Sequence, residues 1–361
     1  MSDRLVFNGI DADSGQYLYP QTTVDQLAAG LLEAPVEQDP HLDELAQRKA
    51  RDDPTYGVAY PARADKLDEA GWAIVTAADA SSDAAAALEP LIAMRRDQAG
   101  RLFKTFTGDD GVRPRETKDE WLGRHGMGPG DAEPNKVPYY LLLIGGPEEI
   151  PFRFQYELDV HYAVGRVAFD TPDEYARYAR AVVAADSESG GGPASFAVFA
   201  PENPDDPATG LSATDLAAPL ADEVQAAARH GGDVARFVGP TATKQQLTNM
   251  VCGAETPRLL FTASHGIGLP AGDARQLNLQ GALLCQDWPG PRAWVDRPIE
   301  QGFYFAAADI PDDPERLPQV MFSFACFGAG TPVEDDYGRL RRFRPRTLAP
   351  RAFVSRLPQR L

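Results

Sequence analysis

Cysteine is scarce in this sequence. The 361 residues include three cysteines, Cys252, Cys285 and Cys326, which are odd in number and widely spaced. Such a set provides neither a disulfide framework nor the closely spaced ligands of a zinc site, so we expect free thiols, a reducing compartment and no metal. The GGPEE turn at 145–149 lacks the glycine spacing that cradles phosphates, and no cofactor is predicted.

Long hydrophobic runs and an excess of positive charge are absent as well. No run approaches the roughly 18 apolar residues of a membrane span, and the start, MSDRLVFNGIDADSG, lacks the charged-then-apolar pattern of a secretory signal. The 53 acidic residues against 35 basic ones give a net charge of −18, which argues against nucleic acid as a partner. These absences predict a cytoplasmic protein that binds neither membrane nor nucleic acid.

The order of apolar runs along the chain predicts a fold in two similar parts. Residues 1–70 have weak periodicity and form a poorly determined N-terminal segment, whereas 71–190 and 191–361 each alternate short apolar strands with helical patterns. The glycine run SGGGP at 189–193 is typical of a linker. Such alternation predicts an α/β fold with mostly parallel sheets, in which ligands bind at the carboxyl ends of the strands. Strands are expected at 137–146, 160–169, 195–201, 257–266 and 319–330.

Two reactive side chains follow strands that are predicted in the second part. LLFTAS (259–264) precedes His265 and Gly266, and VMFSFA (320–325) precedes Cys326. Parallel strands bring both side chains to one edge of the sheet, where an imidazole in contact with a thiol can take its proton and produce a nucleophilic thiolate. The backbone N–H groups of Gly266 and Cys326 would then form an oxyanion hole, worth roughly 3 kcal/mol per donor.

A structural interpretation stands beside this catalytic one. A cysteine at the end of an apolar strand is more often a small buried hydrophobe than a nucleophile. The alternative function is therefore a catalytically silent scaffold or sensor subunit that binds a protein partner.

Two short motifs carry a resemblance to a known family. FTASHG (261–266) and FACFGAG (324–330) resemble the histidine and cysteine motifs of the caspase-like (clan CD) cysteine peptidases, the group that includes caspases, gingipains and bacterial CHAT-domain proteases. YYLLLIGGPEEIP (139–151) and the segment 161–179 are similar to a gingipain-like pattern. The resemblance implies a caspase-like three-layer α/β/α fold with two consecutive subdomains, of which the second is catalytic.

The resemblance also implies roles for residues. His265 would be the general base and acid, Cys326 the nucleophile that forms a thioester acyl-enzyme, and Gly266 an oxyanion donor through its backbone N–H. The protein would then be an intracellular endopeptidase without a cofactor, acting on protein or peptide substrates in stress response, cell death or defence.

Substrate selectivity is less well defined by the motifs. Phe327 and Gly328 follow the cysteine where caspases commonly have an Arg-Gly pair, so caspase-type selectivity for aspartate does not carry over. Asp159 lies where gingipain-like enzymes place acidic and aromatic residues near the pocket for the residue before the cut, which implies a preference for arginine or lysine. A solvated loop carboxylate is the alternative for Asp159.

The C-terminal region departs from the family pattern. The family fold continues beyond the nucleophile strand with a helix and further strands, whereas this chain stops at Leu361. Residues 347–361 are predicted to form that helix, with Thr347 as its N-cap. The rest of the sheet would then be supplied by a separate C-terminal chain, or the sequence is truncated.

Overall fold

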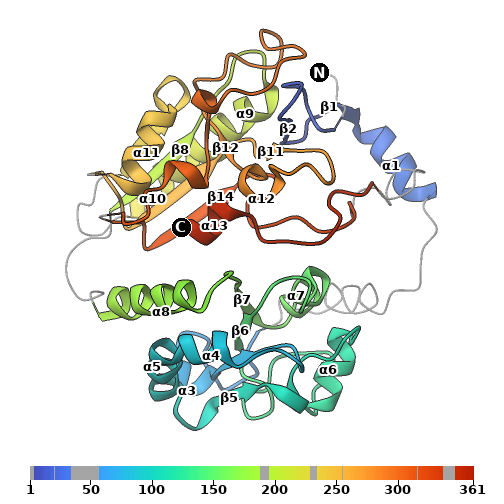
Figure 1. Ribbon diagram of the computed structural model, residues 1–361, viewed down its shortest axis with the longest axis vertical. Helices are drawn as coiled ribbons and strands as arrows, with labels where there is room; N and C mark the ends of the chain where they lie inside the picture. The colour runs from blue at the N-terminus through green and yellow to red at the C-terminus, as the bar shows by residue number, and fades with distance from the viewer. Residues whose placement is uncertain are drawn as a thin grey trace. The chain divides into compact units, whose positions relative to one another are not determined.

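The chain divides into two compact units. The computed structural model describes residues 4–19, 21–33, 57–187, 195–227, 234–253, 255–314, 316–335 and 346–361 (Figure 1). Unit 1 comprises residues 1–34 and 191–361, and unit 2 comprises residues 35–190. The N-terminal segment expected over 1–70 is thus split between the units, because its first part pairs with strands of unit 1. The predicted linker at 189–193 lies outside the described residues.

The described residues of unit 2 form a four-stranded parallel sheet in the order β5-β4-β6-β7. Its strands are β4 (Trp72–Val75), β5 (Phe103–Phe106), β6 (Tyr140–Ile144) and β7 (Ala163–Val167). Alternate residues of β4 face opposite layers, and all four are buried. Trp72 and Ile74 pack with α4 (Asp83–Ala87), α5 (Glu89–Ala99) and α8 (Pro172–Ser187). Ala73 and Val75 pack with α6 (Lys118–Arg124) and α7 (Phe152–Leu158).

Unit 1 repeats this plan in its described part, with a parallel sheet in the order β14-β10-β8-β9 (Figure 1). Its strands are β8 (Phe196–Ala200), β9 (Val234–Val238), β10 (Leu259–Ala263) and β14 (Val320–Phe324). On one face the sheet packs against α11 (Lys244–Cys252). On the other it packs against a π-helical stretch at Ser212–Ala217, which continues α9 (Pro207–Leu211), and against α10 (Ala218–Ala227).

The two sheets therefore share one topology. When the strands of each unit are counted along the chain, the second strand lies at one edge, followed by the first, the third and the fourth. Both faces of each sheet carry helices. The predicted α/β class, with mostly parallel sheets between layers of helices, is confirmed.

Short pairings attach the N-terminal segment, which we define as residues 4–19, to its surroundings in unit 1. β1 (Arg4–Leu5) pairs antiparallel with β3 (Thr22–Thr23), which precedes α1 (Val24–Glu33). β2 (Ile10–Asp11) pairs parallel with β11 (Ile267–Gly268), directly after His265 and Gly266. Strands of two residues have no periodicity of their own, so these pairings could not be predicted from the sequence. The remaining elements are α3 (Leu67–Ala70), α12 (Gln276–Leu279), the antiparallel pair β12 (Leu283–Leu284) and β13 (Tyr304–Phe305), and 3-10 turns at Gly100–Leu102, Gly108–Asp110, Gly239–Thr241, Gln301–Phe303 and Ala307–Asp309.

The helix predicted over 347–361 is wrong for most of its length. Only α13 (Arg356–Arg360) is helical, and Thr347 pairs with Glu334 in an isolated β-bridge instead of capping a helix. Leu348 and Ala349 are buried in this extended stretch, and Pro350 removes a backbone donor that a helix would use.

β14 lies at an edge of its sheet. Its side chains Val320 and Phe322 are each 56% exposed, so one face of this strand is uncovered. Coverage by a separate C-terminal chain stays a prediction. None of the helices in the described part of the chain combines the length and apolarity that a membrane crossing requires.

Candidate active site

Adjacent parallel strands bring His265 and Cys326 to the same edge of the unit 1 sheet. β10 and β14 pair in register, with Ala263 opposite Phe324, and the Ser264 N–H extends the ladder by donating to the Phe324 carbonyl over 3.1 Å. His265 and Cys326 each follow two residues after the end of their strand. The common edge thus follows from the strand register.

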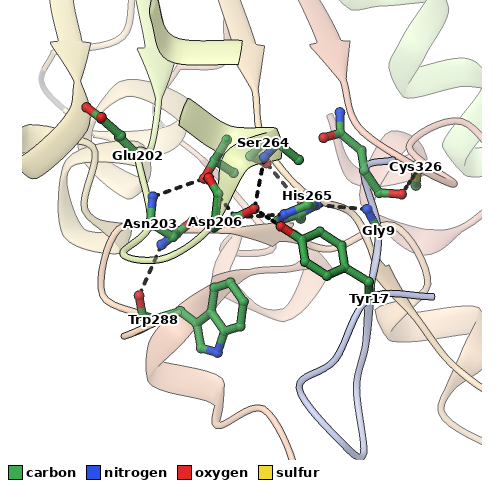
Figure 2. A network of polar contacts seen from close by, with 12 residues as sticks. Gly9, Tyr17, Glu202, Asn203, Asp206, Ser264, His265, Trp288 and Cys326 are labelled. Carbon is green, nitrogen blue, oxygen red and sulfur yellow. Dashed lines mark hydrogen bonds and ion pairs between the residues drawn. The ribbon is translucent and has the colours of Figure 1, made fainter. Parts of the chain in front are cut away.

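Both ring nitrogens of His265 have partners. The side chain is fully buried, and its Nε2 lies 2.8 Å from Oδ2 of Asp206. Its Nδ1 accepts a hydrogen bond of 2.8 Å from the Gly9 backbone N–H (Figure 2). Because Nδ1 accepts, the ring proton of the neutral imidazole is assigned to Nε2, which donates to the carboxylate. The rings of Tyr17 and Trp288 lie edge-on to the imidazole, with centroids at 5.7 and 6.4 Å.

Asp206 is the residue of this site that sequence reasoning missed. It follows β8 and is the N-cap of α9, where one carboxylate oxygen accepts from the Ala208 N–H over 3.2 Å. The Thr209 hydroxyl donates to the other oxygen over 2.7 Å, and the Tyr17 hydroxyl also donates to the carboxylate. Burial alone would raise the pKa of Asp206, but the hydrogen bonds and charge of His265 and its other partners outweigh burial and lower it. The Asp-Pro pair that begins α9 is a sequence signal for this cap.

Cys326 does not contact His265 through a hydrogen bond, contrary to the direct imidazole–thiol contact that we expected. In the described residues its Sγ donates instead to the backbone carbonyl of Asn8, over 2.9 Å. Burial raises the pKa of this thiol to about 11, so it is protonated at neutral pH. Phe327, directly after it, has a left-handed φ of 58°, which turns the chain sharply at the end of the strand.

One peptide unit therefore contacts both candidate catalytic side chains. The carbonyl oxygen of Asn8 accepts from Cys326 Sγ, and the nitrogen of the same peptide bond, that of Gly9, donates to His265 Nδ1. Figure 2 shows Gly9 next to Cys326 and His265, with Asp206 on the other side of the imidazole and the Tyr17 hydroxyl extending to Asp206. The N-terminal segment separates the thiol from the imidazole, which explains why the two do not meet.

Gly266 has a steric role that its predicted catalytic role did not anticipate. A Cβ atom at this position would lie 1.8 Å from the Cys326 carbonyl oxygen, so only glycine allows the two backbones to pack so closely. Its own carbonyl accepts from the Ile10 N–H over 3.3 Å. Among the described hydrogen bonds none joins the Gly266 N–H to the Asn8 carbonyl, and the oxyanion role stays a prediction.

Asp159 lies in unit 2, whereas His265, Gly266 and Cys326 lie in unit 1. It ends α7, and its carboxylate accepts a hydrogen bond of 3.1 Å from the Val164 N–H. Burial raises its pKa. These contacts give Asp159 a local structural role, and its contribution to a substrate pocket stays a prediction.

Unit 2 lacks the catalytic pair at the corresponding edge. The two sheets share one strand order, so β6 corresponds to β10 and β7 corresponds to β14. The position of His265, two residues after β10, is occupied by Gly146 after β6, and the position of Cys326, two residues after β14, is occupied by Phe169 after β7. Neither side chain can transfer a proton or act as a nucleophile. The candidate catalytic pair therefore has no counterpart at these two positions of unit 2.

A cavity of about 460 Å³ adjoins the thiol. The N-terminal segment, α9 with its π-helical extension, and the end of β14 each contribute to its wall. Among the described residues no charged side chain lines it, and its lining includes Phe7, Asn8, Ala208, Ser212, Ser323 and Cys326.

Comparison with known proteins found no matching family model, no similar curated protein and no similar solved structure. Function is therefore inferred from the geometry of this site and from the two motifs.

Proposed function

We propose that this protein is a caspase-like cysteine endopeptidase with Cys326 as nucleophile and His265 as general base and acid. The observation that carries the proposal is the peptide bond Asn8–Gly9, whose oxygen lies 2.9 Å from Sγ and whose nitrogen lies 2.8 Å from Nδ1. Acyl transfer from a peptide requires a thiol beside the carbonyl group and an imidazole at the leaving nitrogen, and for the attack Sγ has to move from the carbonyl oxygen to the carbonyl carbon.

The chemistry follows from these positions. Cys326 loses its proton to His265 and attacks the carbonyl carbon of the bound peptide, and His265 returns the proton to the departing nitrogen. A thioester forms, and water then hydrolyses it. Asp206 accepts from Nε2, so it fixes the orientation of the imidazole and stabilises its protonated form. No cofactor enters this scheme, and a free thiol nucleophile is compatible with the reducing cytoplasm that we propose as its location.

Turnover of internally quenched peptides tests the proposal. The peptides carry arginine, lysine, aspartate, asparagine or leucine before the cut, and the full chain is compared with Cys326→Ala and the matched control Cys252→Ala. Because the N-terminal segment fills the site, Gly9→Ala is included: a Cβ there would lie 2.9 Å from Leu18 Cδ1 and 3.3 Å from Cys326 Sγ, which displaces the segment.

We expect turnover that is lost in Cys326→Ala and kept in Cys252→Ala. Gly130→Ala controls for backbone strain, since Gly130 also has a positive φ but has open space around it. Absence of turnover from both the full chain and Gly9→Ala would reject the peptidase function.

A catalytically silent scaffold is the second candidate. The protonated, buried thiol and the filled site favour it, because neither is a feature of an enzyme poised to bind external substrate. It predicts that Cys326 stays without catalytic effect even when the N-terminal segment is displaced.

A further inference from the structure

We propose that the chain cleaves its own peptide bond between Asn8 and Gly9, so that the N-terminal segment is the first substrate of the site. This inference rests on the proposed peptidase function. The peptide unit of that bond already lies between the two candidate catalytic side chains of the same chain, with its oxygen at Cys326 Sγ and its nitrogen at His265 Nδ1.

The residues after the bond are held like those of a bound peptide substrate. The Ile10 N–H donates to the Gly266 carbonyl over 3.3 Å, and the Ala12 N–H donates to the Gly268 carbonyl over 2.9 Å. Ile10 is fully buried, so its side chain anchors this strand. Addition of an extended strand to the edge of a sheet element is a common way to bind a peptide with fixed register.

Glycine is required on the leaving side of the bond. Gly9 has φ 113°, a conformation that residues with a Cβ rarely adopt, and its carbonyl accepts from the Leu18 N–H over 3.0 Å. A side chain would also crowd Cys326 Sγ, as its Cβ would lie 3.3 Å away. The approach of the thiol to this peptide unit therefore depends on Gly9.

The acyl side of the bond identifies a substrate class. Asn8 borders the 460 Å³ cavity beside the thiol, and none of the described residues that line this cavity has a charged side chain. Such a cavity has no counter-charge for arginine, lysine or aspartate before the cut. The site thus selects an uncharged residue such as asparagine, followed by glycine.

The reaction balances without any co-reactant except water. Cys326 Sγ forms a bond to the Asn8 carbonyl carbon while the carbon–nitrogen bond to Gly9 breaks, and the thiol proton passes through His265 to the Gly9 nitrogen. Water then hydrolyses the thioester, which releases residues 1–8 with a C-terminal carboxylate and restores the thiol. The remaining chain begins with the amino group of Gly9.

The test is the intact mass of the full chain over time at neutral pH, with Cys326→Ala and Cys326→Ser as inactive variants and Cys252→Ala as the matched control. We expect loss of residues 1–8 from the wild-type and Cys252→Ala chains, at a rate independent of protein concentration, and full length in both inactive variants. Hydroxylamine added during the reaction should capture the thioester, so that the released peptide ends in a hydroxamate on Asn8 in the wild-type and Cys252→Ala chains. The same treatment of Cys326→Ala measures the direct attack of hydroxylamine on the Asn-Gly bond, and equal hydroxamate in Cys326→Ala would contradict a thioester.

The outcomes separate this inference from the proposed function. Self-cleavage alone would be overturned if the wild-type chain stays intact and external peptides are nevertheless hydrolysed, by the wild type or by Gly9→Ala, in a way that depends on Cys326. Cleavage at another bond would overturn the assignment of Asn8–Gly9. An intact chain without turnover of any peptide would overturn both.

Discussion

Replacing Asp206 by asparagine tests the charge behind the imidazole. The substitution keeps the shape of the side chain. In the wild type His265 Nε2 lies 2.8 Å from Oδ2 of Asp206, and the amide oxygen of asparagine can accept the same hydrogen bond. The amide nitrogen must then face the two groups that donate to Oδ1, the Ala208 N–H at 3.2 Å and the Tyr17 hydroxyl. The hydroxyl can turn and accept from the amide, whereas the hydrogen bond of the Ala208 N–H to a charged acceptor is lost. That loss destabilises the fold by about 1.5–3 kcal/mol.

The larger effect is on catalysis, because each proton transfer creates an imidazolium in a fully buried position. A unit charge about 4 Å away contributes about 4 kcal/mol at an effective dielectric constant of about 20. Since about 1.4 kcal/mol corresponds to a tenfold change in rate, Asp206→Asn should lower kcat roughly 1000-fold. KM should change little, because Asp206 contacts His265 and lies behind it relative to the Asn8–Gly9 peptide.

Initial rates of peptide hydrolysis and the thermal unfolding midpoint check this prediction. The control is Asp205→Asn, the same change at the neighbouring position, where the carboxylate forms an exposed ion pair of 3.2 Å with Arg292. We expect the control to retain nearly full activity. Equal kcat for Asp206→Asn and wild type, or an equal loss in Asp205→Asn, would refute the assigned role of the Asp206 charge.

Two further predictions concern Gly266 and Cys326. Gly266→Ala places a Cβ 1.8 Å from the Cys326 carbonyl oxygen, so we expect about 1–3 kcal/mol of destabilisation and loss of activity. Gly128→Ala is the control, because a Cβ there would have nothing within 4 Å. Denaturant titrations and rate assays should show unchanged stability and activity for this control. Because burial raises the pKa of Cys326 from 9.0 to about 11, iodoacetamide should label it in the uncleaved chain roughly 100-fold more slowly at pH 7 than a thiol of pKa 9, with about a tenfold increase per pH unit up to pH 10. Labelling that reaches a plateau below pH 9 in peptide maps would contradict that environment.

The central sheets could be predicted because buried parallel strands leave a clear signal. The runs at 137–146, 195–201 and 257–266 contain β6, β8 and β10, and each run is apolar because helices cover both faces of its strand. The edge position of β14 does not alter its apolar composition, so it was predicted as well. Strand order then placed His265 and Cys326 at one edge without further information.

The rest of the site could not be predicted, because it depends on contacts between distant parts of the chain. Asp206 lies 59 residues before His265, and only the fold of β8 beside β10 brings them together. The N-terminal segment is more extreme, since Gly9 meets His265 across 256 positions through strands of two residues. Neither hydrophobic periodicity nor a motif indicates such a pairing.

Occupation of the site by its own chain controls access to external substrates. Burial of Ile10 contributes about 2 kcal/mol and its two neighbouring backbone hydrogen bonds about 1 kcal/mol each. The hydrogen bonds of Gln16 to the Pro291 carbonyl and of Tyr17 to Asp206 add to this sum, so the segment after the bond is held by more than about 4 kcal/mol and leaves the site in fewer than about one in 1000 molecules. Cleavage at Asn8–Gly9 changes this balance, because it converts an amide N–H next to the buried His265 into a charged ammonium. Burial of a charge costs several kcal/mol unless it is paired, so the new ammonium weakens the binding of the segment after the bond. The proposed self-cleavage would therefore release residues 1–8, which opens the acyl side of the site to other peptides, and weaken the hold of the new N-terminus at His265.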